Sequence, residues 1–83
     1  MYSVKLTKQA KKQLDKLGTV YLTKTLKAID ELEIDPFLGN KMKGELKGLY
    51  RVKVPPIRII YKPDIKRKNI IIIVIGHRQG IYG

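Results

Sequence analysis

Residues 49–62 decide the fold, and their sequence is LYRVKVPPIRIIYK. In the first half, aromatic and aliphatic side chains alternate with the cations Arg51 and Lys53. This period of two is typical of a β-strand that buries one face and leaves the other open. Pro55-Pro56 has no N–H to donate to a sheet, so it marks the turn into a second strand over residues 57–62. The segment therefore predicts a β-hairpin with cations on its open face.

The sequence on the C-terminal side predicts one more strand. Residues 63–69 are mostly charged and are expected to form the hairpin loop that leads into it. Residues 70–75 are apolar at every position, which predicts a central strand covered on both faces. Gly76 is expected to end this strand, and the remaining residues form a tail.

The N-terminal half predicts a short strand over residues 2–6 and two helices. Thr7 is suited to cap the first helix, because its hydroxyl accepts a hydrogen bond from a free N–H of the first turn. The second helix is expected to begin near Thr19 and to end at Asp35-Pro36, since the residue before a proline is forced out of the helical region. A loop over residues 36–48 follows. The apolar stripes of the two helices are Ala10, Leu14 and Leu17, and Leu22, Leu26, Ile29 and Leu32.

These elements predict a single α+β domain, residues 1–83, in the order β-α-α-β-β-β. A helical hairpin is expected to pack on one face of a small, mostly antiparallel sheet. The absence of cysteine excludes disulfides, thiolate metal sites and a cysteine nucleophile, and we expect neither a cofactor nor a metal. The longest apolar run, residues 70–75, is far below the roughly 20 residues of a membrane span, and the N-terminus lacks the apolar stretch of a secretory signal. We therefore expect a soluble, cytoplasmic protein with no membrane association.

Charge is the strongest compositional signal. The 18 lysines and arginines outnumber the seven acidic residues and give a net charge of +11. The excess is concentrated in residues 39–83, which hold eleven basic and two acidic residues. Such a field attracts polyanions, so this half is expected to meet phosphate or carboxylate groups. Lys43 and Lys47, in the predicted loop, are candidates for phosphate binding.

Cations of the predicted sheet are expected to converge on its open face. Arg51 and Lys53 stand there if the helices cover the other face, and Arg58 joins them from the next strand. His77 and Arg78 arrive at the end of the last strand. Opposed like charges on adjacent strands repel, so solvent or a bound anion must compensate the cluster. Arginine offers a phosphate a two-pronged donor, and lysine supplies a point charge.

Three blocks of the sequence resemble the RelE group of the RelE/ParE toxin superfamily. They are LKGLYRVKV at residues 46–54, IRIIY at residues 57–61 and VIGHRQGIY at residues 74–82. The resemblance extends over essentially the whole chain, including VKLT at residues 4–7 and DPF at residues 35–37. It implies a type II toxin that cuts mRNA in the A site of the ribosome, beside the 16S rRNA. It also implies an acidic antitoxin that wraps the toxin and blocks it.

The resemblance further implies roles for single residues. Two basic residues of the family's first hairpin strand fall on Arg51 and Lys53, and the arginine of the next strand falls on Arg58. The basic and aromatic residues of the tail fall on Arg78 and Tyr82. Because Arg51 stands where the best-known RelE pattern has a lysine, we expect it to bind phosphate rather than to take a proton.

Cleavage of RNA without a metal uses the 2′-hydroxyl as nucleophile and needs a base, an acid and cations for the phosphorane oxygens. Lys53 is a candidate base, because neighbouring like charge disfavours its protonated form. His77 is the candidate acid, or the base if Lys53 stays charged. Arg58 and Arg78 are expected to stabilise the transition state, and Tyr82 to stack on a base. With so few proton-transfer groups, we expect weak activity on free RNA and dependence on the ribosome to orient the message.

Two other functions remain open. One is a ParE-like DNA gyrase inhibitor of the same fold, although that branch usually lacks the basic set at positions 51, 53, 58 and 78. The other is a non-catalytic RNA-binding module, which the charge alone would allow.

Overall fold

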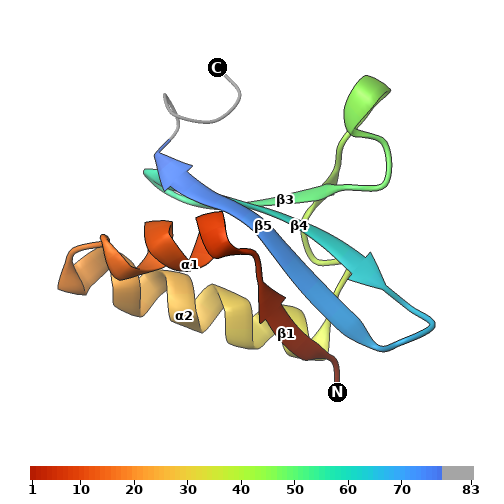
Figure 1. Cartoon of the computed structure of the whole chain (residues 1–83), viewed down its shortest axis with the longest axis horizontal. Coiled ribbons are helices and arrows are strands. Elements are labelled where there is room, and N and C mark those ends of the chain that lie inside the picture. The colour runs from red at the N-terminus through yellow and green to blue at the C-terminus, as the bar shows by residue number, and fades with distance from the viewer. Residues whose placement is uncertain (78–83) are drawn as a thin grey trace.

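The computed structural model describes residues 1–77, in which two α-helices pack on one face of a five-stranded sheet (Figure 1). The strand order is β1-β5-β4-β3-β2. β1 runs parallel to β5, and the other neighbouring pairs are antiparallel. This confirms the predicted α+β class and the mostly antiparallel sheet. The elements are β1 (Ser3–Leu6), α1 (Lys8–Asp15), α2 (Thr19–Ile34), β2 (Asn40–Lys41), the 3₁₀ helix η1 (Gly44–Leu46), β3 (Tyr50–Val54), β4 (Ile57–Asp64) and β5 (Asn69–His77).

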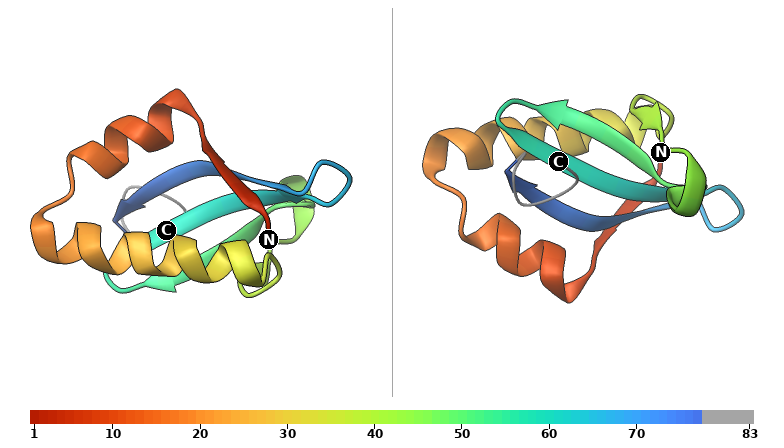
Figure 2. Two further views of the ribbon diagram at one scale, coloured as in Figure 1. Left: turned by 90° about the horizontal axis from the view of Figure 1, so that it is seen from below. Right: turned by 90° about the horizontal axis from the view of Figure 1, so that it is seen from above.

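The hydrophobic core lies between the sheet and the helices. The two helices diverge from the turn that joins them, so each covers a different part of the sheet (Figure 2). α1 packs mainly against β5, whereas α2 faces β3. Neither α-helix of residues 1–77 is long and apolar enough to cross a lipid bilayer. The buried core side chains are Ala10, Ala28, Ile29, Leu32, Ile57, Ile59, Tyr61, Ile70, Ile72 and Ile75.

Side chains of α1 and of its N-cap also hydrogen-bond backbone groups on the edge of β5 that β1 leaves unpaired. β1 pairs with β5 only as far as Ile72, which leaves the next backbone groups of that edge without a strand. The Thr7 hydroxyl accepts a hydrogen bond from the N–H of Ala10 at 3.1 Å, as a helix cap, and donates one to the carbonyl of Ile73 at 2.9 Å. The Gln13 side chain accepts from the N–H of Ile75 at 2.8 Å. Buried backbone groups must find such partners, so the cap predicted at Thr7 is confirmed and has a second role.

Three predicted boundaries in the C-terminal half are wrong. The predicted loop over residues 36–48 contains β2 and η1. The hairpin loop is shorter than predicted, because the ladder between β4 and β5 continues to Asp64 and Asn69. Pro63 is tolerated there because β3 ends opposite Tyr61, so β4 is paired on one side only at this point. Gly76 does not end the last strand, because it pairs with Arg58 and β5 continues to His77.

The predicted burial of two elements is also partly wrong. Leu26 is 44% exposed, and Thr25 and Ala28 take its place on the buried side of α2. β5 lies inside the sheet as predicted, but only Ile70, Ile72 and Ile75 are fully buried, and the side chains between them are half-buried. A β-bulge shifts the register, so that Ile60 pairs with Val74 and Tyr61 with Ile72. The extra residue changes which positions of β5 face the helices.

Candidate active site on the open face of the sheet

The hairpin of β3 and β4 brings Lys53 and Arg58 together. Lys53 lies directly opposite Arg58, and Arg51 lies opposite Ile60. Directly opposed residues of an antiparallel pair share one face of the sheet, with Cβ atoms about 4.5–5.5 Å apart. The other face carries Tyr50, Val52 and Val54, which pack against the core. The predicted placement of Arg51, Lys53 and Arg58 on the open face is therefore what the structure shows.

A cavity of about 310 Å³ adjoins the Lys53–Arg58 pair. Its lining consists of these two residues with Pro55, Pro56 and Ile57. Lys53 is exposed and Arg58 half-buried. Two opposed cations beside a cavity form a site where an anion would relieve their mutual repulsion.

Arg51 extends the cationic surface and lies beside a buried apolar side chain on the same face of the sheet. Ile60, its cross-strand neighbour, is only 1% exposed although it lies outside the main core. The Nε atom of Arg51 is buried and has no hydrogen-bond partner among residues 1–77. A charge beside buried apolar surface interacts more strongly with a bound anion than one surrounded by water.

Gly39 and Tyr61 fix the backbone beside Arg51. The Tyr61 hydroxyl accepts a hydrogen bond from the N–H of Gly39 at 2.9 Å. The Tyr61 ring stacks on Tyr50 at a centroid distance of 5.7 Å, and Phe37 meets Tyr50 edge-on at 5.6 Å. Burial raises the pKa of the Tyr61 phenol, and the hydrogen bond from Gly39 opposes this effect. The neutral phenol thus joins the loop before β2 to the centre of the sheet.

Replacing Tyr61 by phenylalanine is expected to lower the free energy of unfolding by about 1–2 kcal/mol at pH 7, because the Gly39 N–H loses its acceptor. The difference from the wild type should depend on pH. The raised pKa means that the folded state holds the phenolic proton more tightly, so the contribution is complete below about pH 10, the pKa of a free tyrosine. It is lost as the pH rises through the folded pKa.

Urea unfolding of the two proteins between pH 7 and pH 11 measures this difference. Its decrease above pH 10 would support the role of the buried phenol, because changes in lysine charge affect both proteins alike. A difference that is constant over the whole range would contradict it.

Not all of the remaining predicted site residues lie beside the Lys53–Arg58 pair. Lys43 and Lys47 are exposed and flank η1, at the opposite end of β3 from the Lys53–Arg58 pair (Figure 1). The backbone of His77 pairs with Ile57, and its side chain lies outside what the structure describes. The predicted roles of Arg78 and Tyr82 also fall outside the described residues. Among residues 1–77, no three His, Asp or Glu side chains are grouped so that they could hold a metal ion.

Several residues of this region were not singled out from the sequence. Lys24, Lys27 and Glu31 of α2 line a second cavity, with a volume of about 460 Å³, together with Arg51 and Lys53. Their spacing of three and four residues places them on one side of a helix, which is a signal available in the sequence. Gly39 carried no such signal, because its contact with Tyr61 joins residues 22 positions apart.

Comparison with known proteins identifies the family. The model of the family described as "ParE toxin of type II toxin–antitoxin system, parDE" matches residues 4–82. The chain belongs to this family. It is a type II toxin of the RelE/ParE superfamily, as the sequence resemblance implied.

The relatives include toxins that carry RelE names. Toxin RelG of Mycobacterium tuberculosis is 28% identical over 83 residues, which cover 98% of this toxin and 95% of that protein. The crystal structure of the toxin–antitoxin complex RelBE2 from the same organism matches with a TM-score of 0.84 and 26% identity over 93% of this chain and 98% of that chain. The archaeal RelE–RelB complex from Pyrococcus horikoshii OT3 matches with a TM-score of 0.75 and 31% identity over 93% and 94%.

Proposed function

We propose that this toxin is a ribosome-dependent mRNA endoribonuclease that stops translation by cutting the message. The observation that carries the proposal is the direct opposition of Lys53 and Arg58 beside a cavity on the open face. A gyrase inhibitor has no chemical need for two opposed cations beside a cavity. A nuclease needs cations there to stabilise the charge of the phosphorane.

In the proposed reaction the 2′-oxygen of one nucleotide attacks the adjacent phosphorus. A base removes the 2′-hydroxyl proton, the O2′–P bond forms, and the P–O5′ bond breaks. An acid supplies a proton to the leaving 5′-oxygen, so the products carry a 2′,3′-cyclic phosphate and a 5′-hydroxyl. Lys53 and His77 are the proposed proton-transfer groups, in either order. Arg58, with Arg78, is proposed to stabilise the phosphorane, and Arg51 to bind phosphate.

The ribosome is proposed to orient the message for cleavage. The proposed proton-transfer groups are only Lys53 and His77, so orientation of the message must contribute much of the rate. Holding a nucleophile in line with the bond to be broken contributes up to several kcal/mol. Lys43 and Lys47, at the other end of β3, are proposed to bind message or 16S rRNA phosphates beyond the cleavage point.

The proposed partner in the resting cell is an acidic antitoxin in the cytoplasm. Two of the matched crystal structures are the toxin–antitoxin complex RelBE2 and an archaeal RelE–RelB complex. This chain carries a net charge of +11, and a protein of opposite charge that binds only the folded toxin would also stabilise it.

Primer-extension mapping of a translated message tests the proposed activity. We expect cuts inside the reading frame after addition of the purified toxin to a translating system, and little cleavage of the same RNA without ribosomes. Equally rapid cleavage of naked RNA would contradict the dependence on ribosomes. Intact messages throughout growth arrest would contradict the nuclease function.

A gyrase inhibitor is the second candidate, because the matching family model bears the description of a ParE toxin. The two candidates differ in their target. A supercoiling assay with purified gyrase should show no inhibition by this toxin if the nuclease proposal is correct. Inhibition of supercoiling with intact messages would favour the gyrase function instead.

A further inference from the structure

A β-bulge interrupts the pairing of β5 with β4. Ile73 is the extra residue, because Ile72 and Val74 pair with successive residues of β4. The carbonyls of Ile72 and Ile73 both accept from Thr7, the first from its N–H at 3.0 Å and the second from its hydroxyl at 2.9 Å. Successive carbonyls of a regular strand point in opposite directions. This pair of hydrogen bonds therefore belongs to the bulge and holds it in place.

The bulge places Gly76 opposite Arg58. If the regular ladder before the bulge simply continued, Ile75 would lie opposite Arg58 instead. In the observed register Ile75 is fully buried in the core, and a residue without a side chain occupies the position beside Arg58. The bulge thus keeps a large apolar side chain out of the candidate active site.

Gly76 continues the row of residues that contains the two opposed cations. The cross-strand partner of Arg58 on β3 is Lys53, and its partner on β5 is Gly76. Directly opposed residues share a face of the sheet, so the three positions lie in one row across the open face. Gly76 is half-buried, and part of its surface is therefore accessible to a bound molecule.

The backbone conformation at Gly76 does not itself require glycine. Gly76 is paired with β4, and so are its neighbours on both sides. Extended backbone of this kind suits other residues equally well, and glycine weakens a strand because it loses more conformational entropy on folding. A glycine inside a strand often marks a place where a ligand approaches the backbone closely. What this position offers is the absence of a side chain.

We propose that Gly76 is a substrate-binding position, at which the ribose–phosphate chain of the message lies directly against the sheet. This inference rests on the proposed nuclease function and adds the residue that admits the substrate. Arg58 is half-buried, so a phosphate must approach the sheet closely to reach its guanidinium group. A side chain at position 76 would hold the ribose away from the sheet and the phosphate away from Arg58.

A ribose–phosphate chain needs this opening more than an acidic peptide does. A peptide carries its negative charge at the ends of flexible side chains, which can reach a cation while the peptide backbone stays at a distance. RNA carries its charge on the backbone itself, so the sugar must approach together with the phosphate. The row of Lys53, Arg58 and Gly76 combines cations with the space that such an approach requires.

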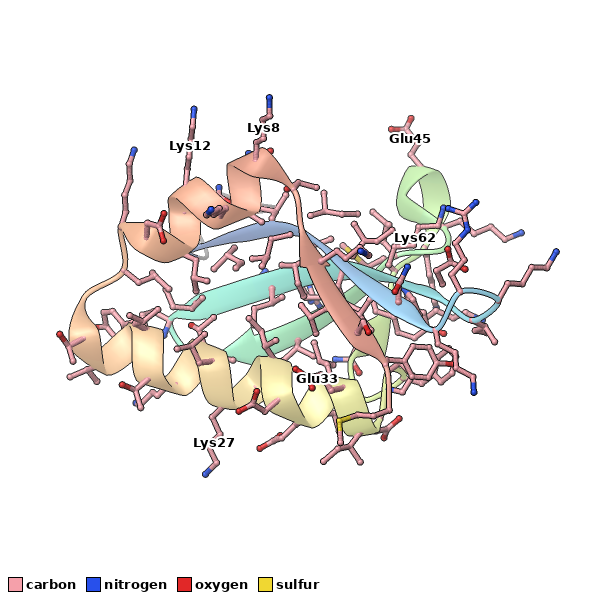
Figure 3. The ribbon with its side chains drawn as sticks, turned by 60° about the horizontal axis from the view of Figure 1, so that its bottom comes forward. Lys8, Lys12, Lys27, Glu33, Glu45 and Lys62 are labelled. Atoms are coloured by element: carbon pink, nitrogen blue, oxygen red, sulfur yellow. The ribbon has the colours of Figure 1, made fainter. Side chains whose placement is uncertain are left out.

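Side chains of increasing size at position 76 test the inference. Gly76→Ala adds a methyl group, and Gly76→Val adds a branched side chain that suits a strand. Ile71→Phe is the control, because Ile71 lies on the same face of β5, opposite Lys62. Figure 3 shows Lys62 on the half of the sheet nearest the β4–β5 hairpin, whereas Gly76 lies near the other end of β5. Single-turnover cleavage of a programmed ribosome and urea unfolding are measured on the full-length wild type and each variant.

We expect Gly76→Ala to cleave about tenfold more slowly than the wild type, and Gly76→Val about 100-fold more slowly, because small displacements of a reacting group are costly. The urea midpoints of both variants should equal or exceed that of the wild type, since each replaces a glycine within a strand. Ile71→Phe should leave the cleavage rate within about twofold. Activity that falls while stability is kept or raised separates contact with the substrate from damage to the fold.

Cleavage by Gly76→Val at the wild-type rate would overturn the inference and leave the proposed function intact. A urea midpoint of Gly76→Ala below that of the wild type would also overturn it, because the protein itself would then fill the space beside Arg58. Equal slowing by Ile71→Phe would assign the effect to the sheet as a whole, with the same consequence. Messages left intact by the wild-type toxin would contradict the nuclease function itself, and the inference with it.

Discussion

Replacement of Lys53 by alanine is expected to lower the rate of message cleavage on the ribosome by about 10²–10⁴-fold, the usual contribution of a proton-transfer group. The reason is the position of Lys53 opposite Arg58 beside the cavity of about 310 Å³. Its side chain is exposed, so the variant should keep its fold. Single-turnover cleavage of a programmed ribosome, read by primer extension, measures the effect, and His77→Ala should be measured beside it.

Two further variants separate the chemistry of Lys53 from its charge. Lys53→Arg keeps the charge but cannot release a proton at neutral pH, so it should be as slow as the alanine variant if Lys53 is the base. Lys62→Ala removes another exposed lysine, from β4, and should leave the rate within about twofold. Undiminished cleavage by both Lys53→Ala and His77→Ala would contradict the proposed proton-transfer roles of these residues. Binding of RNA by the wild-type toxin without any cleavage would end the enzymatic interpretation and favour the non-catalytic module.

Replacement of Gly39 by alanine is expected to lower the free energy of unfolding by about 2–4 kcal/mol. A Cβ atom at this position would lie 2.6 Å from the carbonyl oxygen of Arg51, 2.8 Å from the Tyr61 hydroxyl oxygen and 2.9 Å from a Val52 methyl carbon. The carbonyl oxygen belongs to the sheet and cannot move without disturbing the pairing of β2 with β3. The variant should therefore lose cleavage activity as well, because Arg51 shifts with its backbone.

Gly18→Ala is the matched control for this substitution. Gly18 lies at the start of α2, and an added Cβ there would meet nothing within 4 Å. We expect its effect on the free energy of unfolding to stay below about 1 kcal/mol. Chemical denaturation of the two variants measures both values. Equal stabilities would show that the close approach at Gly39 is not a constraint on the fold.

Local patterns in the sequence were sufficient for the helices and for the cationic hairpin. Thr7 and Asp35-Pro36 marked helix ends through backbone chemistry that depends only on near neighbours. The alternation around Arg51 and Lys53 gave the strand and its two faces, because the period of two fixes which side chains share a face. The pairing across the turn then followed from the position of Pro55-Pro56.

Features that depend on distant contacts could not be predicted. The bulge opposite Ile60 and Tyr61 arises where two strands meet, and nothing in the uniformly apolar residues 70–75 marks it. The contact of Gln13 with Ile75 joins residues 62 positions apart. The exposure of Leu26 follows from how α2 packs on the sheet. Its apolar side chain alone does not indicate which side of the helix faces the core. For the candidate site, the sequence indicated which cations would gather but not the second cavity beside α2, since the residues that line it come from separate segments.

The position of β5 in the sheet has a consequence for synthesis of the protein. This strand is made after the others, yet it lies between β1 and β4, and its isoleucines at positions 70, 72 and 75 belong to the core. A nascent chain that stops before residue 69 lacks β5, the strand with which β1 pairs. It also lacks half of the buried core side chains that the strands contribute. Assembly of the sheet must therefore wait until β5 (Asn69–His77) has been synthesised. Under the proposed nuclease function, a ribosome must therefore translate the codons of β5 before its own product can fold and cut a message.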